Sequence, residues 1–145
     1  MPQNIICLGS DHAGPELKRD IADFIKQLGY TPLDFGVPLG TVASNYPEVA
    51  QTVGRKVLSV EGSLGILICG TGNGMAMVAN KIPGIRAALC TSEFMAQMAR
   101  SHNNANILTL GARVLGQGLA LSIVQRFLTT NFEGGRHAER IALFN

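Results

Sequence analysis

The sequence predicts an α/β fold built on a parallel sheet of five strands. Short apolar runs alternate along the chain with longer segments in which apolar residues recur every three or four positions, the pattern of repeated strand–helix–strand units. Glycine-rich segments follow two of these runs, at residues 9–14 and 70–74, where a parallel strand would turn toward its helix. With 145 residues, 46% of them hydrophobic, the chain is long enough for a sizeable core, and we expect residues 1–145 to form a single domain.

The first half of the chain contains two strand–helix units before a central strand. Pro15 favours the start of the first helix because proline suits a helical N-terminus, and Gly29 favours its end. The second helix begins near Asn45 and carries valines at every fourth position, which places them on one face. The elements predicted here are strands at 5–8, 31–35 and 66–68, and helices at 15–28 and 45–60.

The second half continues the same alternation. The glycine-rich turn after Cys69 leads into a helical segment, and Ser92 suits the cap of the next helix because its hydroxyl can accept from an unpaired N–H group. A later amphipathic segment is predicted to be helical despite two glycines near its start. The elements predicted here are strands at 85–89 and 107–110, helices at 75–80, 92–100 and 115–128, and a short helix at the end of the tail 132–140.

Charge, cysteine content and hydropathy limit the classes of protein to which the chain can belong. A net charge of +2 without a run of lysine and arginine argues against nucleic acid as a partner. Three cysteines, an odd number, argue against a disulfide framework and for a reducing compartment. No signal peptide and no apolar stretch of membrane-spanning length are found, so we expect no membrane association and a cytoplasmic protein. The positive mean hydropathy predicts a subunit interface.

One segment has the residues of a reactive or anion-binding site. The apolar run 66–68 is followed by Cys69 and then by the turn Gly70-Thr71-Gly72-Asn73-Gly74. Backbone N–H groups without a helical partner converge at such a turn, and glycines let a ligand approach the backbone closely. The turn could therefore bind an anion and favour the thiolate form of Cys69. The alternative is a buried structural cysteine, as we expect for Cys7 and Cys90.

Named motifs with similar composition do not fit the spacing of this turn. A dinucleotide fingerprint needs a glycine three residues after the second one, whereas Gly74 comes two residues after Gly72. A Walker phosphate loop needs lysine after its last glycine, and a cysteine phosphatase loop needs an arginine six residues after the nucleophile. Met75 occupies both of those positions, so the spacing fails for the first two classes and argues against the third.

Ligand sites of open parallel sheets lie at the carboxyl ends of the strands, and this brings several polar residues together. Asp11 and His12 follow the first strand, the turn after Cys69 follows the central one, and Arg113 follows the last. In contrast, His102 precedes the last strand and starts at the opposite edge. We therefore expect a second copy of the chain to bring His102 to Cys69.

With Asp11 and His12 after the first strand, the turn from Cys69 to Gly74, and then His102 and Arg113, the sequence resembles ribose-5-phosphate isomerase type B, in the family shared with the galactose-6-phosphate isomerase subunits. The resemblance covers nearly the whole chain and implies a Rossmann-like three-layer α/β/α subunit. It also implies a homodimer or dimer of dimers with active sites at the interface, the tail 132–145 packing on the partner. The matching segments are 9–14, 46–47, 68–75, 79–81, 84–87, 102–106, 110–113 and 134–137.

The activity that the resemblance implies is the interconversion of D-ribose 5-phosphate and D-ribulose 5-phosphate, a step of the pentose phosphate pathway, without a metal or other cofactor. Such an aldose–ketose isomerisation moves a proton from carbon 2 to carbon 1 through an enediolate and needs a base and stabilisation of oxyanion charge. By resemblance, Cys69 is the base and His102 the acid that opens the sugar ring. Thr71 steadies the charged groups, and Asp11 relays protons between sugar oxygens.

The remaining site residues are implied to bind the substrate. Backbone amides of the glycine-rich turn hold the enediolate oxygens, Asn103 binds a sugar hydroxyl, and paired guanidinium groups suit the phosphate. The substrate-binding residues are Asp11, His12, Gly70, Thr71, Gly72, Asn73, Gly74, Asn103, Arg113, Arg136 and Arg140.

Several assignments have structural alternatives. Asp11 would equally suit a helix cap, and His102 by itself would more often bridge a loop. Arg136 and Arg140 would form a solvated face unless the tail packs on a neighbour. Tyr46 would line the sugar pocket or pack in the core, and His137 is expected to be structural or peripheral.

The chain departs from the family at a few positions, and other functions stay open. Asn45 and Asn104 stand where relatives often have acidic residues, which bears on hydroxyl recognition. Some relatives use a glutamate as base where this chain has Met75, so the thiol mechanism is the one expected here. The alternative functions are isomerisation of a six-carbon sugar phosphate such as allose 6-phosphate or galactose 6-phosphate, non-catalytic sugar-phosphate binding, and a thiol-dependent transfer.

Overall fold

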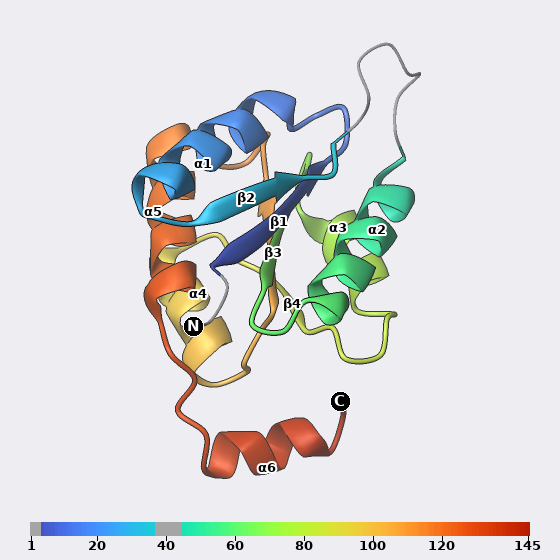
Figure 1. Ribbon diagram of the computed structural model, residues 1–145, viewed down its shortest axis with the longest axis vertical. Helices are drawn as coiled ribbons and strands as arrows, with labels where there is room; N and C mark the ends of the chain where they lie inside the picture. Colours follow the sequence, from blue (N-terminus) through green and yellow to red (C-terminus); the bar gives the residue numbers. More distant parts are fainter. Residues whose placement is uncertain (1–3, 37–44) are drawn as a thin grey trace.

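The computed structural model describes residues 4–36 and 45–145, and the fold class predicted from the sequence is confirmed. All the strand pairs are parallel and the sheet has the order β2-β1-β3-β5-β4 (Figure 1). The strands are β1 (Ile5–Ser10), β2 (Thr31–Asp34), β3 (Leu64–Cys69), β4 (Ala87–Leu89) and β5 (Ile107–Gly111). The helices are α1 (Pro15–Gln27), α2 (Tyr46–Ser59), α3 (Asn73–Ala79), α4 (Glu93–Ser101), α5 (Gln117–Thr129) and α6 (Arg136–Ala142).

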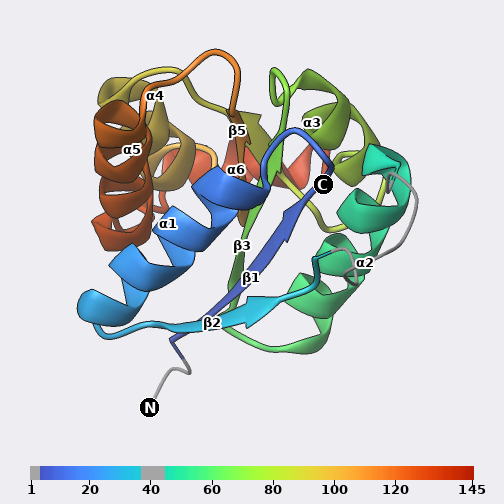
Figure 2. The same ribbon diagram turned by 90° about the horizontal axis from the view of Figure 1, so that it is seen from above.

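Helices cover both faces of the sheet and give three layers. Helices α1, α4 and α5 lie on one face, and α2 and α3 lie on the other (Figure 2). The central strands β1, β3 and β5 are buried over nearly their whole length because both of their faces are covered. Among the described residues, no helix has both the length and the apolar character needed to cross a membrane.

The start of β4 differs from the prediction. The apolar pattern predicts a strand from residue 85, whereas β4 begins at Ala87. The side chain of Asn106 holds the intervening backbone, because its amide donates to the carbonyl of Gly84 and its oxygen accepts from the N–H of Arg86. Residues 84–86 thus bond to the side chain of Asn106 where strand residues would bond to a neighbouring backbone. Hydrophobic periodicity cannot predict such a side-chain hydrogen bond.

The helix ends follow the residues that cap them. Ser92 caps α4 as predicted, with its hydroxyl accepting from the N–H of Met95. Helix α5 begins at Gln117, two residues later than predicted, because the N–H of Leu115 still bonds back to the carbonyl of Gly111 at the end of β5. The predicted amphipathic pattern is otherwise preserved in both helices.

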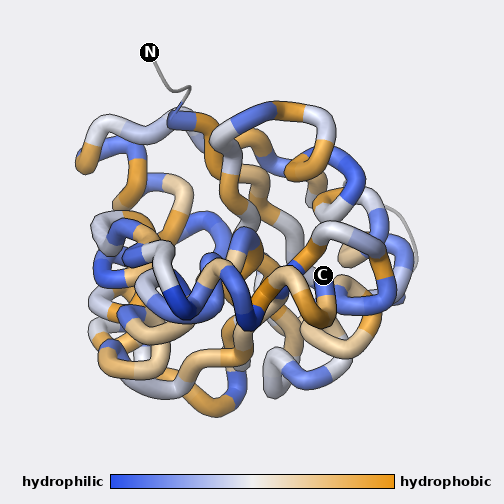
Figure 3. Tube along the Cα trace, turned by 90° about the horizontal axis from the view of Figure 1, so that it is seen from below, coloured by the Kyte–Doolittle hydropathy of each residue, from blue (hydrophilic) through white to orange (hydrophobic). Residues whose placement is uncertain are grey.

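The C-terminal segment lies apart from the two helical layers. Helix α6 crosses the edge of the sheet at which the strands begin (Figure 1). Seen from below, this segment is hydrophilic at its start and more hydrophobic toward its end (Figure 3). It is attached at two points: the N–H of Glu133 donates to the carbonyl of Ser101, and the guanidinium of Arg86 donates to the side chain of Asn145. The tail therefore belongs to the same edge as the loop after α4.

Candidate active site

The turn after β3 places the Cys69 thiol at the carboxyl edge of the sheet. Cys69 is the last residue of the strand, is 5% exposed, and its Sγ accepts a hydrogen bond of 3.1 Å from the N–H of Gly72. Gly72 has a φ of +88°, a conformation that favours glycine. The hydroxyl of Thr71 accepts from the N–H of Asn73. A backbone donor directed at the sulfur stabilises negative charge on it, as a reacting thiolate requires.

Backbone hydrogen bonds from the residues that follow β5 hold this turn in place. The N–H of Ala112 donates to the carbonyl of Cys69 at 2.9 Å, and the N–H of Arg113 donates to the carbonyl of Gly70 at 3.0 Å. A Cβ added to Gly70 would lie 3.5 Å from Nη1 of Arg113, so this guanidinium lies beside the turn. The predicted proximity of Arg113 to the glycine-rich turn is therefore observed.

Two further predicted residues lie at this edge. The N–H of Asp11 donates to the carbonyl of Ile68, which places Asp11 next to Cys69. Its carboxylate accepts from the N–H of Ala13 at 2.9 Å and so closes the turn before α1, whose cap position is occupied by Gly14. His12, the next residue in the chain, is exposed.

Tyr46 also borders the glycine-rich turn. A Cβ on Gly74 would lie 2.7 Å from the ring of Tyr46, and the side chain is 41% exposed. Tyr46 therefore covers the turn rather than packing in the core. Asn45 is exposed and makes no capping hydrogen bond to α2 through its side chain.

His102 and Asn103 lie at the opposite edge of the sheet. The register pairs Gly65 with Ile107 and Cys69 with Gly111, so Cys69 is four strand residues beyond the start of β5. At about 3.3 Å per residue this is about 13 Å along the strands, and His102 lies before β5 begins. One chain thus does not bring His102 to Cys69, as the order of the elements predicts.

The loop after α4 is fixed by two arginines. Arg86 donates to the carbonyls of Asn103 and Asn104, and burial lowers the pKa of its guanidinium. Arg100 donates to the side chain of Asn104 and to the carbonyl of Ala105, and burial followed by the charge of Arg86 lowers its pKa. Asn104 has a φ of +46°, which asparagine tolerates better than most residues.

The tail brings Arg136, His137 and Arg140 to the same edge as His102. The rings of His102 and His137 stack, with centroids 4.2 Å apart and planes inclined by 11°. Burial, followed by the charges of His102 and Arg136, lowers the pKa of His137. Arg136 and Arg140 are exposed and stand four residues apart on α6. His137 is therefore a neighbour of His102 and not a peripheral residue.

A hollow of about 430 Å³ lies at this edge as well. Arg86, Asn103 and Phe144 are among the residues that line it, whereas Cys69 and the glycine-rich turn do not. The two halves of the predicted site therefore lie at the two ends of the strands.

A comparison with known families decides the class of the protein. The family model described as Ribose/Galactose Isomerase matches residues 6–144. The chain belongs to the ribose/galactose isomerase family. This confirms the resemblance predicted from the motifs and, with it, the isomerase class.

Solved structures of other family members share the fold over nearly the whole chain. Ribose-5-phosphate isomerase B from Clostridium thermocellum is 51% identical, with a TM-score of 0.90 over 96% of this chain and 93% of that one. Ribose-5-phosphate isomerase B from Mycoplasma genitalium, solved with bound ribulose-5-phosphate, is 42% identical, with a TM-score of 0.90 over 96% of this chain and 92% of that one.

Relatives found by sequence include an enzyme with another named substrate. A D-erythrulose-4-phosphate isomerase from Pectobacterium atrosepticum is 43% identical over 94% of this chain and 90% of its own.

Two residues at the edge that carries His102 were not predicted from the sequence. Arg86 lies in a segment that matches the family, but its neighbours do not reveal that it binds the loop after α4. Glu133 lies 3.7 Å from Nε2 of His102 and 4.0 Å from Nε2 of His137. Helical spacing does not predict this contact, because Glu133 lies before α6 and is separated from it by Gly134 and Gly135, both with positive φ.

We predict that Gly111→Ala will displace the glycine-rich turn of the isomerase. A Cβ at this position would lie 2.6 Å from the carbonyl oxygen of Thr71, a backbone atom that cannot rotate away. The free energy of unfolding should fall by about 1–3 kcal/mol, measured by urea denaturation, and turnover should fall with it. Gly118→Ala is the matched control, because nothing lies within 4 Å of that position. Equal turnover in the two variants would contradict the proposed contact.

Proposed function

We propose that this chain interconverts D-ribose 5-phosphate and D-ribulose 5-phosphate. The observation that carries the proposal is the Cys69 thiol, held by the N–H of Gly72 in the glycine-rich turn of a ribose/galactose isomerase. A member with the same fold has been solved with ribulose-5-phosphate bound, which supports this pair of sugar phosphates.

In the proposed mechanism Cys69 removes the proton from carbon 2 of the open-chain aldose and returns it to carbon 1. The electron pair left behind forms an enediolate, whose oxygens the backbone amides of the glycine-rich turn would stabilise. Thr71 and Asp11 lie beside the thiol, and Asp11 would carry the proton between the two sugar oxygens. No electrons leave the sugar, so the reaction needs no redox cofactor and, we propose, no metal.

We assign ring opening and phosphate binding mainly to residues at the edge of the sheet that carries His102. His102 would protonate the ring oxygen of the furanose, and Asn103 would bind a hydroxyl group. Arg136 and Arg140 would hold the phosphate, with Arg113 and His12 contributing from the edge that carries Cys69.

A complete site on this assignment needs two subunits. Cys69 and His102 lie at opposite ends of the strands, and we propose a homodimer, alone or as half of a tetramer, in which the partner supplies His102 and the tail. The end of the tail supports this: Leu143 is 87% exposed and Phe144 65%, which is unfavourable for apolar side chains in water. The thiols of all three cysteines are free, which suits the cytoplasm in which we place the enzyme.

A second candidate substrate is a sugar phosphate of different length. The relative from Pectobacterium atrosepticum, a D-erythrulose-4-phosphate isomerase, is 43% identical, close to the 42% of the ribose-5-phosphate isomerase B from Mycoplasma genitalium. Six-carbon sugar phosphates remain the other alternative, because the two edges of the site come from different subunits and their separation sets the length of the substrate.

Turnover measurements test the proposal. With EDTA present, we expect kcat/KM for D-ribose 5-phosphate to exceed the values for D-erythrulose 4-phosphate and allose 6-phosphate by about tenfold or more, because an unfilled or crowded pocket costs that much. A higher value for either rival would reassign the substrate. Tight binding of ribose 5-phosphate without turnover would indicate a binding protein instead.

A further inference from the structure

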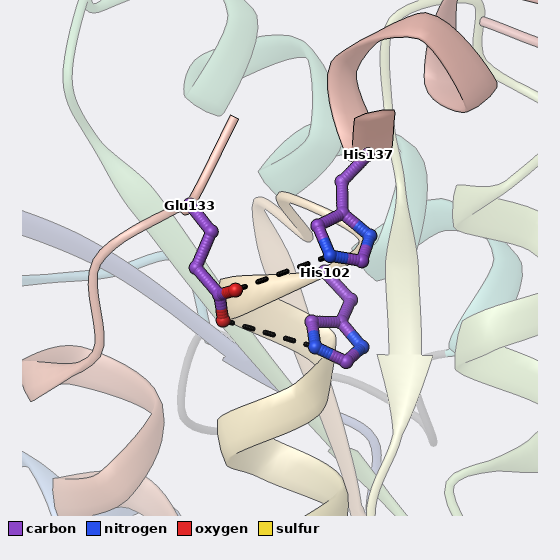
Figure 4. Close-up of side chains that lie close together, drawn as sticks. All are labelled: His102, Glu133 and His137. Atoms are coloured by element: carbon purple, nitrogen blue, oxygen red, sulfur yellow. Dashed lines mark ion pairs between the residues drawn. The ribbon is translucent and has the colours of Figure 1, made fainter. Parts of the chain in front are cut away.

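Three side chains at the edge that carries His102 form a cluster with the chemistry of a metal site. Nε2 of His102 and Nε2 of His137 each face one carboxylate oxygen of Glu133, and the two rings are stacked on each other (Figure 4). Within the described part of the chain, these are the residues whose ligand atoms all lie within 4.8 Å of one another. Two imidazoles and a carboxylate are a ligand set that suits Zn²⁺ and its neighbours in the transition series.

The distances in the cluster suit an intervening ion better than a direct hydrogen bond. The two nitrogen–oxygen separations, 3.7 and 4.0 Å, are too long for a hydrogen bond. Ligand atoms about 2.1 Å from a tetrahedral Zn²⁺ lie about 3.4 Å from one another. The two nitrogen–oxygen separations would have to shrink by about 0.3 and 0.6 Å, and Glu133, whose side chain is 57% exposed, is free to move that far. Because the planes of the two rings are inclined by only 11°, one ring would also have to turn for both nitrogens to face the same ion.

We propose that His102, Glu133 and His137 bind a divalent transition-metal ion such as Zn²⁺, and that the bound ion inhibits isomerisation. Arg136 and Arg140 repel a cation, and the carboxylate of Glu133 offsets part of that repulsion. The inhibition rests on the proposed function, because the ion would occupy the nitrogen of His102 that faces Glu133 and immobilise the ring-opening acid. The binding of the ion does not rest on it.

Histidine ring spectra test the binding without any measurement of activity. Zn²⁺ added to ¹⁵N-labelled Cys69→Ala protein should shift the ring nitrogens of His102 and His137. The control is the same protein with Glu133→Gln added, which should need about tenfold more Zn²⁺ for the same shifts. The Cys69→Ala background removes the thiol nearest to solvent as a competing ligand.

Paired variants identify the carboxylate. Glu133→Gln should weaken Zn²⁺ binding about tenfold or more, because loss of a ligating or orienting group typically costs that much. Glu139→Gln removes the same charge from an exposed position on α6 outside the cluster and should leave binding unchanged. Equal affinities in the two variants, or the absence of ring shifts at His102 and His137, would each overturn the site.

Kinetics test the inhibition in the wild-type enzyme. Zn²⁺ should lower kcat/KM, EDTA should restore it, and Glu133→Gln should need about tenfold more Zn²⁺ for the same fractional loss. Ring shifts at His102 and His137 without loss of turnover would overturn the inhibition. A protein that binds Zn²⁺ at these rings but has no isomerase activity in EDTA would refute the proposed function and leave the ion site standing.

Discussion

Replacement of Cys69 by alanine is expected to lower kcat for D-ribose 5-phosphate by about 10³- to 10⁴-fold, the contribution of a positioned general base at its upper end. The thiol is the group at the carboxyl edge that accepts the hydrogen bond of Gly72, and alanine leaves no atom that can take the proton from carbon 2. The affinity for the sugar phosphate should change little, because the residues assigned to the phosphate are elsewhere. Stopped assays at high enzyme concentration and calorimetric titration with substrate measure the two quantities.

Cys90→Ala is the matched control for this variant. Cys90 is 1% exposed, and burial raises the pKa of its thiol to about 11; burial also raises the pKa of Cys7. Both stay protonated and unreactive near neutral pH. Iodoacetamide should therefore inactivate the wild-type enzyme in step with modification of Cys69 alone. Full turnover after alkylation of Cys69 would show that another group is the base.

Mixing two inactive variants is expected to restore activity if the site is shared between subunits. Cys69→Ala and His102→Ala each disable every site in their own homodimers. A mixed dimer has one site that carries both substitutions and one that carries neither. Random reassembly makes half of the dimers mixed, so activity should recover to about one quarter of the wild-type value.

The experiment denatures the two variants together, refolds the mixture, and compares its turnover with that of each variant refolded alone. The matched control mixes Cys69→Ala with Thr71→Ala, whose positions lie on the same turn. Both substitutions then affect the same side of every shared site, so no intact site arises in the mixed dimer. Recovery in the control, or none in the test mixture, would contradict a site built from two chains.

Much of the fold could be predicted from the sequence because its determinants are local. Alternation of apolar runs with helical patterns gave each strand and helix, and Ser92 caps α4 as its side chain predicts. The start of β4 was missed because it depends on the side chain of Asn106, twenty residues away from its partner Arg86. A bond between distant residues leaves no trace in hydrophobic periodicity.

The candidate site could likewise be predicted from the sequence only in part. The neighbours of Cys69 could be predicted, since residues that follow parallel strands meet at one edge. The cluster around His102 could not, because Glu133 and His137 reach it through a tail whose path depends on one backbone bond to Ser101 and on the stacking of two rings. The position of Tyr46 over Gly74 likewise depends on how α2 packs against the turn.

The two hydrogen bonds that attach the tail have a consequence for the proposed site shared between two chains. Glu133 is tied to the end of α4 and Asn145 to Arg86, which also grips the loop that bears His102. In the proposed dimer, His102 and the arginines of α6 would therefore keep their positions relative to one another when the subunits shift. A loosened interface would change the distance from the thiol to carbon 2 but leave the contacts of Arg136 and Arg140 with the phosphate as they were. Substitutions at the subunit contact should consequently slow the proton transfer before they weaken the capture of the substrate.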